Sequence, residues 1–238
     1  CIRKVEELMC TVGEPIPATT PGKYWFLLRE FGRQILHRAF PRISFGRGKA
    51  QHALLVEKVQ AMERLGQAGY FLGEPMSFLI GATSINDAER AGAVGLLASG
   101  YASLAQLLTN FNLHRPAVYY RALALRYVDC DMNNAHRAFA LELIGFNLYL
   151  NGDWSASQKI VRGLVSRAEH STRRRHRLEL QMLVALSFYT PGIYHEAIEL
   201  VDSTLMEAIE LGDAVPQAWA LLAQAEIYLH VDPDPPTR

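Results

Sequence analysis

The sequence predicts an all-α protein, built as a right-handed solenoid of antiparallel helix hairpins. Three observations lead to this fold class. Apolar residues recur at three- and four-residue steps and no run alternates strictly, a pattern typical of helices rather than strands. Strong helix formers such as Leu, Ala, Glu, Arg and Gln dominate the chain. Gly and Pro interrupt the apolar runs at short loops, which favours antiparallel neighbours.

The loops are evenly spaced. Gly73, Asn112, Gly152 and Gly192 follow one another at intervals of 39, 40 and 40 residues. Seven residues before each of these positions stands a Gly or Ala, although the alignment used only the loops: Gly66, Ala105, Gly145 and Ala185. A small residue at a fixed helix position lets a partner helix approach closely. We therefore interpret the period as a repeated helix hairpin, and stacked hairpins share one continuous core.

This period divides the chain into elements. Residues 1–48 are expected to hold the end of a preceding helix, a Pro-bearing linker and a capping helix over 22–40. The capping helix is rich in basic residues, namely Arg29, Arg33, His37 and Arg38. A repeat array over 49–238 follows, with these hairpins and a final half repeat: 49–92, 93–131, 132–170, 171–212 and 213–230. The start at Cys1 and the incomplete last repeat indicate a fragment of a longer protein.

Composition narrows the classes of partner and compartment. The 238 residues are 50% hydrophobic and 20% charged, the balance of a folded protein. Lys plus Arg and Asp plus Glu both number 24, whereas binders of nucleic acid or anionic membranes are usually basic. We expect no membrane or nucleic-acid partner. Cys1, Cys10 and Cys130 fit no disulfide framework, which favours a reducing, cytoplasmic location.

The motifs that carry chemistry are missing. A phosphate-binding loop needs Gly-x4-Gly-Lys-Ser/Thr, and the closest stretch, residues 45–50, lacks the first glycine and the hydroxyl. The eight histidines form no His-x3-His pair and no Cys/His cluster, so we expect no metal. No Gly-x-Ser-x-Gly elbow is present. We predict no catalytic residue and no cofactor.

Two groups of residues are candidates for binding a partner. Tyr119, Tyr120 and Arg121 begin the second helix of a hairpin, from which a side chain can reach the concave groove of a repeat array. The basic run around Arg175 is suited to phosphate or an acidic peptide. A solvated junction between repeats is the favoured interpretation of that run, because blocks of like charge usually lie exposed. The candidate residues are Tyr119, Tyr120, Arg121, Arg173, Arg174, Arg175 and Arg177.

Several stretches resemble a known repeat family. Gly192–Ala197 has the pattern Gly-x-Tyr-x-x-Ala of the tetratricopeptide repeat, whose usual period is about 34 residues. The stretches Leu113–Leu125, Leu150–Glu169 and Arg173–Leu205 resemble the lengthened repeats at the C-terminus of bacterial multidomain AAA ATPase and adenylate cyclase proteins. This resemblance implies upstream cyclase and ATPase domains, and a regulatory or partner-docking role for the present chain.

The expected function is therefore a non-catalytic protein-interaction or regulatory scaffold. Its expected partners are a protein or peptide, or the upstream domains of the same polypeptide, and a small-molecule effector also fits. Three alternatives remain open. The first is the ligand-sensing repeat region of an ATP-dependent transcription activator, and the second is a free-standing adaptor. The third is an all-helical enzyme with a closed pocket of titratable residues.

Overall fold

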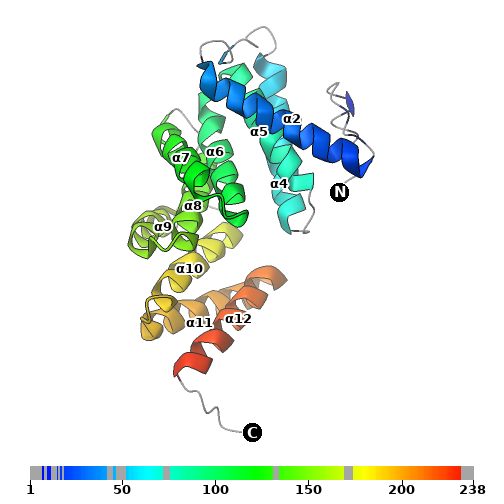
Figure 1. The fold of residues 1–238 in the computed structure, drawn as a ribbon. Coiled ribbons are helices and arrows are strands. Elements are labelled where there is room, and N and C mark those ends of the chain that lie inside the picture. Colours follow the sequence, from blue (N-terminus) through cyan, green and yellow to red (C-terminus); the bar gives the residue numbers. More distant parts are fainter. Residues whose placement is uncertain are drawn as a thin grey trace. The chain divides into compact units, whose positions relative to one another are not determined.

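The computed structural model describes residues 7, 10–11, 15, 17, 19–41, 45–46, 52–71, 76–130, 134–168 and 174–231. This part of the chain contains ten helices and no strand, which confirms the all-α class (Figure 1). None of the helices described is both long and apolar enough to cross a membrane. The helices are α2 (Thr20–Ala39), α4 (His52–Phe71), α5 (Met76–Ala91), α6 (Val94–Asn110), α7 (His114–Tyr127), α8 (Asn134–Leu150), α9 (Trp154–Ala168), α10 (Arg174–Tyr189), α11 (Tyr194–Leu211) and α12 (Ala214–Val231).

The chain divides into two compact units, residues 1–140 and 141–238. In the first unit α4 packs on α5, α5 on α6 and α6 on α7, and α2 packs across α5 (Figure 1). In the second unit α9 packs on α10, α10 on α11, and α11 on α12. Each unit thus consists of helices that pack mainly on their neighbours in sequence.

The turns between helices contain residues in the left-handed region. Gly152 and Gly192 have φ values of 81° and 89°, and Asn112 reaches 58°. Only Gly, and to a lesser degree Asn, adopts this conformation without a large steric cost, so these residues end one helix and let the next begin. Three of the four evenly spaced loop residues therefore lie at helix-ending turns. The fourth, Gly73, lies outside the described residues.

The close helix approach expected at the small residues occurs at Gly145. A Cβ atom added there would lie 2.5 Å from Cγ2 of Val161 on α9. The Ser157 hydroxyl of α9 donates a hydrogen bond of 2.8 Å to the carbonyl oxygen of Gly145. Ser157 is fully buried, and this hydrogen bond satisfies its hydroxyl. Side chains of α9 therefore contact the backbone of α8 directly.

We expect Gly145→Ala to lower the free energy of unfolding by about 1–3 kcal/mol, the usual cost of overpacking. Val161 cannot move aside cheaply, because it is fully buried and its branched side chain is stiff at χ1. Gly163→Ala on α9 is the matched control: nothing lies within 4 Å of its added Cβ. That change should stabilise the helix by about 0.5–1 kcal/mol. Urea unfolding followed by circular dichroism measures both, and equal shifts would contradict the close approach.

Candidate functional site: an inverted amphipathic helix

Helix α2 starts at a well-defined cap. The Thr19 side chain accepts a hydrogen bond of 3.3 Å from the backbone N–H of Gly22, and Pro21 occupies the first turn. Both features are typical of helix N-termini, since the hydroxyl satisfies a free N–H group and proline has none to satisfy. The sequence therefore fixes where this helix begins, and the helix extends through Ala39.

The burial of α2 is the reverse of that in an ordinary amphipathic helix. Its buried stripe runs through Phe26, Glu30, Gln34 and His37, at steps of four, four and three residues. Three of these four side chains are polar. The opposite stripe exposes 57–70% of each of its large apolar residues, which are Tyr24, Trp25, Leu28, Ile35 and Leu36. A surface helix normally turns its apolar stripe to the core, so the orientation of α2 requires a specific cause.

The cause is a buried polar network, and Glu89 of α5 is its centre. Glu89 is 1% exposed and accepts hydrogen bonds from the Tyr101 hydroxyl at 2.6 Å and from Gln34 Nε2 at 3.2 Å. His37 and Arg38 also bind its carboxylate. One carboxylate thus ties three residues of α2 to α5 and α6. Hydrogen bonds to a charged group are roughly twice as strong as neutral ones.

A second carboxylate, Glu30, extends this network along α2. Glu30 is fully buried, and Arg29 and Arg33 bind its carboxylate at 2.9 and 3.0 Å. Asn86 of α5 donates to Glu30 Oε2 at 2.8 Å and to the Glu30 carbonyl oxygen at 3.0 Å. Gln34 connects the two carboxylates, because its Nε2 also donates to Asn86 Oδ1 at 2.8 Å. The network therefore extends along most of the buried stripe.

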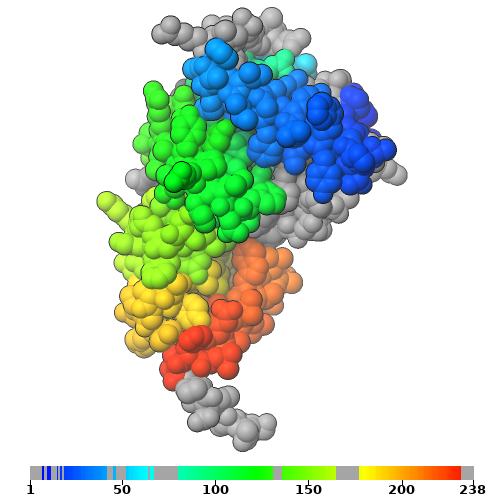
Figure 2. All heavy atoms as spheres, viewed as in Figure 1, coloured from blue at the N-terminus to red at the C-terminus, as the bar shows by residue number. Residues whose placement is uncertain are grey.

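Two tyrosines close the network on the side of α6 and α7. The Tyr120 hydroxyl donates to Gln34 Oε1 at 3.1 Å, and Tyr120 and Tyr101 have ring centroids 6.1 Å apart. In Figure 2 the blue atoms of α2 accordingly lie against the green atoms of α6 and α7. Tyrosine supplies both a large apolar ring and a polar hydroxyl, so it seals such a network and also bonds to it.

A separate buried ion pair joins α4 to α5. Lys58 Nζ lies 2.6 Å from Asp87 Oδ2, and both residues are almost fully buried. Arg90, whose side chain is partly exposed, binds the same carboxylate, with Nη1 at 3.1 Å from Asp87 Oδ1. Helix α5 therefore supplies Asn86, Asp87 and Glu89 to polar contacts with helices on either side. Buried charges of this kind persist only where they are paired.

The tyrosines give the network a predictable response to alkali. Burial raises the pKa of Tyr120 to about 12, and burial together with the Glu89 charge raises the pKa of Tyr101 still further. A phenol whose pKa is raised in the folded state stabilises that state fully below its unfolded value of 10.0. That stability is lost as the pH rises from 10 through 12, because only the unfolded chain then ionises readily.

We therefore expect the first unit to lose stability steeply above pH 10, with Tyr120 contributing up to about pH 12. Ultraviolet absorbance of tyrosinate, recorded beside circular dichroism, follows ionisation and unfolding together. Tyr120→Phe should make the fall in stability with rising pH less steep. Tyr228→Phe, which changes an exposed tyrosine, is the control and should leave the slope unchanged. Ionisation of all tyrosines near pH 10 in the folded protein would contradict the buried network.

The predicted partner-binding residues differ in their exposure and in their contacts. Tyr119 is half exposed, whereas Tyr120 is buried and donates a hydrogen bond to Gln34 in the network. This difference follows from helix geometry, because neighbouring residues on a helix point in different directions. Arg121 is half-buried, and Arg177 pairs with Glu207. Arg173 and the side chains of Arg174 and Arg175 lie outside the described part.

The exposed stripe of α2 is the feature that the sequence interpretation missed. The basic residues of this helix drew attention, and the helix was expected only to cap the array. A signal was present: Glu30, Gln34 and His37 share one side, and the polar group Asn86, Asp87 and Glu89 interrupts an apolar stretch. Such matched polar stripes on two helices indicate that the stripes face each other.

The network holds a helix in place and offers no open chemistry. Each carboxylate is occupied by several donors, which leaves none poised to accept a substrate proton. Over the residues that the structure describes, no three His, Cys, Asp or Glu side chains are grouped to bind a metal ion. The arrangement therefore fits a structural clamp beneath an exposed apolar surface.

Comparison with known proteins gives no match. No family model, curated protein or solved structure matches this chain. The resemblance to tetratricopeptide-type repeats thus depends on the sequence motifs quoted above. The functional interpretation of α2 depends on its geometry.

Proposed function

We propose that this chain is a non-catalytic protein-interaction and regulatory scaffold, and that the exposed apolar stripe of α2 is its docking surface. The observation that carries the proposal is the inverted burial of α2. Fully burying one large apolar side chain contributes about 1.5–3 kcal/mol. Five such side chains of α2 remain in water. The burial free energy that they do not contribute is large beside a net domain stability of about 5–15 kcal/mol. A partner that covers this stripe recovers that free energy.

The edges of the stripe indicate the chemistry of the partner. Arg29 and Arg33 lie four residues apart along one edge, with 44% and 36% of their side chains exposed. Arg38 lies along the other edge and is partly exposed. A helix with an apolar stripe and acidic flanks would complement both features. Such charge complementarity contributes more to specificity and association rate than to affinity.

The wider setting comes from the sequence motifs. We propose that the hairpins are lengthened tetratricopeptide-type repeats of a right-handed solenoid, within a cytoplasmic signalling ATPase or adenylate cyclase. In such a protein the upstream domains of the same polypeptide are the natural partners of α2. A transcription activator or a free-standing adaptor would use the same docking surface. The domains that adjoin this chain distinguish these settings.

The test replaces Leu28 and Ile35 by glutamate. Both side chains are exposed, so folding and circular dichroism should be unchanged. The matched control, Val118→Glu/Leu125→Glu, places the same charges at exposed apolar positions of α7. Proteins captured by wild-type chain are identified, purified and titrated calorimetrically with each variant.

We expect the control to bind as wild type and the stripe variant to bind at least about 100-fold more weakly, since apolar anchors dominate most interfaces. A partner that binds both variants equally well would place the docking surface elsewhere.

A further inference from the structure

The second unit has its own exposed apolar face, on α12. This helix packs through Pro216, Ala220, Ala223 and Ile227, at steps of four, three and four residues. Its opposite side is exposed and almost entirely apolar, with four large side chains: Leu221, Leu222, Tyr228 and Leu229. An exposed apolar face of this extent marks an interaction site.

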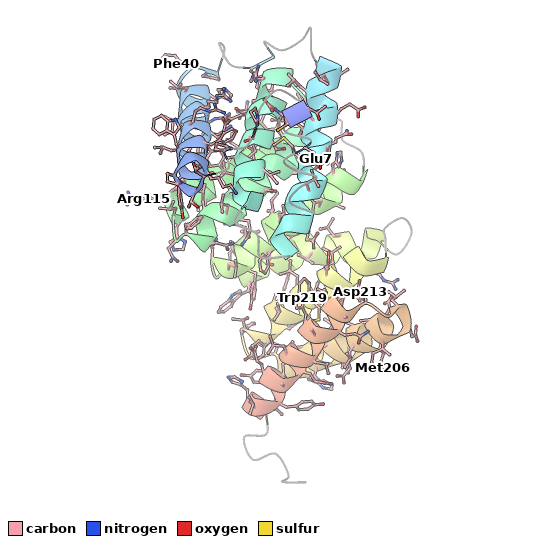
Figure 3. All side chains as sticks on the ribbon, turned by 90° about the vertical axis from the view of Figure 1, so that its right-hand side faces the viewer. Glu7, Phe40, Arg115, Met206, Asp213 and Trp219 are labelled. Carbon is pink, nitrogen blue, oxygen red and sulfur yellow. The ribbon has the colours of Figure 1, made fainter. Side chains whose placement is uncertain are left out.

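The surroundings of this face are acidic. From Tyr194 to Val231 the chain contains no Lys or Arg and seven acidic residues, which are Glu196, Glu199, Asp202, Glu207, Glu210, Asp213 and Glu226. Gln224 of α12 donates a hydrogen bond of 2.8 Å to Asp202 of α11, so the Asp202 carboxylate lies beside α12. Glu207 is paired with Arg177 of α10, and none of the other six acidic residues has an Arg or Lys within this stretch. These helices are found in Figure 3 by their labels, which mark Met206 on α11, Trp219 on α12 and Asp213 in the turn between them. An apolar stripe with basic flanks would complement it.

The acidic border argues against symmetric pairing. If two α12 faces met each other, the acidic residues of both copies would be brought together, and like charges at an interface are costly. A basic, apolar complement is present elsewhere in the same chain. It is the exposed stripe of α2, which is flanked by Arg29, Arg33 and Arg38. These arginines bind the buried Glu30 and Glu89 and are also partly exposed, so they can reach a second carboxylate.

We propose that the α2 stripe of one copy docks on the α12 face of a second copy, head to tail. This inference rests on the proposed function, because it assigns an occupant to the same α2 stripe. The two helices match in length, with 20 and 18 residues, and a rise of about 1.5 Å per residue gives each a contact of roughly 30 Å. Apolar side chains meet in the middle, and arginines meet carboxylates at the edges.

The arrangement has a consequence for assembly. The two docking faces differ, so a pair of copies leaves one α2 stripe and one α12 face unused. Such a heterologous contact continues into a chain of copies unless the rotation between them closes a ring. Because the edges carry opposite charges, added salt should weaken the association.

The test blocks one face at a time. The α2-blocked variant is Leu28→Glu/Ile35→Glu, and the α12-blocked variant is Leu222→Lys/Leu229→Lys. Analytical ultracentrifugation should show a concentration-dependent series for wild type, which salt shifts toward monomer. Each blocked variant alone should associate at least about 100-fold more weakly. An equimolar mixture of the two should form dimers and nothing larger, because only one pair of complementary faces remains.

Three outcomes would overturn the inference: a monomeric wild type, self-association of either blocked variant, or a mixture without dimers. Val118→Lys/Leu125→Lys serves as the control for added charge and should associate like wild type. Circular dichroism and urea unfolding confirm that every variant is folded. If wild type is monomeric but the stripe variant loses its captured partner, head-to-tail docking fails while the proposed function stands. If the captured partner binds the Leu28→Glu/Ile35→Glu variant as tightly as the Val118→Glu/Leu125→Glu control, the proposed function itself fails.

Discussion

Replacing Glu89 with alanine should lower the free energy of unfolding of the first unit by about 3–5 kcal/mol, the cost of breaking a buried charge pair. The change removes the acceptor shared by Gln34, Tyr101, His37 and Arg38. Gln34 keeps its bonds to Asn86 and Tyr120, but the other donors lose a charged acceptor near the core. An unsatisfied buried donor costs more than a hydrogen bond contributes. Helix α2 should separate from α5 before the rest of the unit unfolds.

Urea unfolding by circular dichroism measures the loss, and hydrogen exchange assigns it to α2 and α5. Glu199→Ala, which removes an exposed carboxylate from α11, should leave the stability of the first unit unchanged. Glu89→Gln should fall between alanine and wild type, since the amide keeps one acceptor but no charge. Equal stability of Glu89→Ala and Glu199→Ala would show that the network does not hold α2.

Replacing Lys58 with methionine should cost about 3–5 kcal/mol, because Asp87 then stays buried without its closest cation. Arg90 still binds that carboxylate at 3.1 Å, but 39% of its side chain is exposed. The double variant Lys58→Met/Asp87→Leu should recover most of the loss, since well-packed apolar residues often replace a buried ion pair at little cost.

A double-mutant cycle on Lys58 and Asp87 measures this coupling directly. We expect the sum of the stability losses of the two single variants to exceed the stability loss of the double variant by at least about 1–3 kcal/mol. A coupling of this size is typical of residues in contact. Losses that simply add would mean that the two side chains do not act as a pair. The same cycle on Glu199 and His195, an exposed pair, should show little coupling.

Features set by neighbouring residues were predictable from the sequence. The turns at Asn112, Gly152 and Gly192 are local, because a left-handed residue stops a helix wherever it occurs. The helix expected over 22–40 is α2, Thr20–Ala39, since its cap and composition are also local. The close approach at Gly145 was indicated by a small residue at a repeated position. All three signals lie within a few residues of what they determine.

The orientation of α2 was not predictable in the same way. Its partners Asn86, Glu89 and Tyr120 are separated from Gln34 by 52, 55 and 86 residues in sequence. Apolar periodicity favours burying Leu28 and Ile35, and it assigns Glu30 to solvent. Only the matching polar residues of α5, α6 and α7 reverse that preference, and no local rule pairs them. The burial of Tyr120 was not predictable for the same reason.

Helix α2 buries its polar stripe and exposes its apolar one, and the fluorescence of Trp25 reports this orientation. In a variant with Trp154→Phe and Trp219→Phe, Trp25 is the remaining tryptophan of the chain. Its fluorescence is measured at high dilution, with acrylamide quenching, in buffer and in urea. Since Trp25 is 69% exposed, we predict the emission and quenching of a solvated indole in buffer, with little change on unfolding. A blue-shifted, protected emission that moves to the red in urea would show that α2 faces the core with its apolar stripe, and would contradict the account.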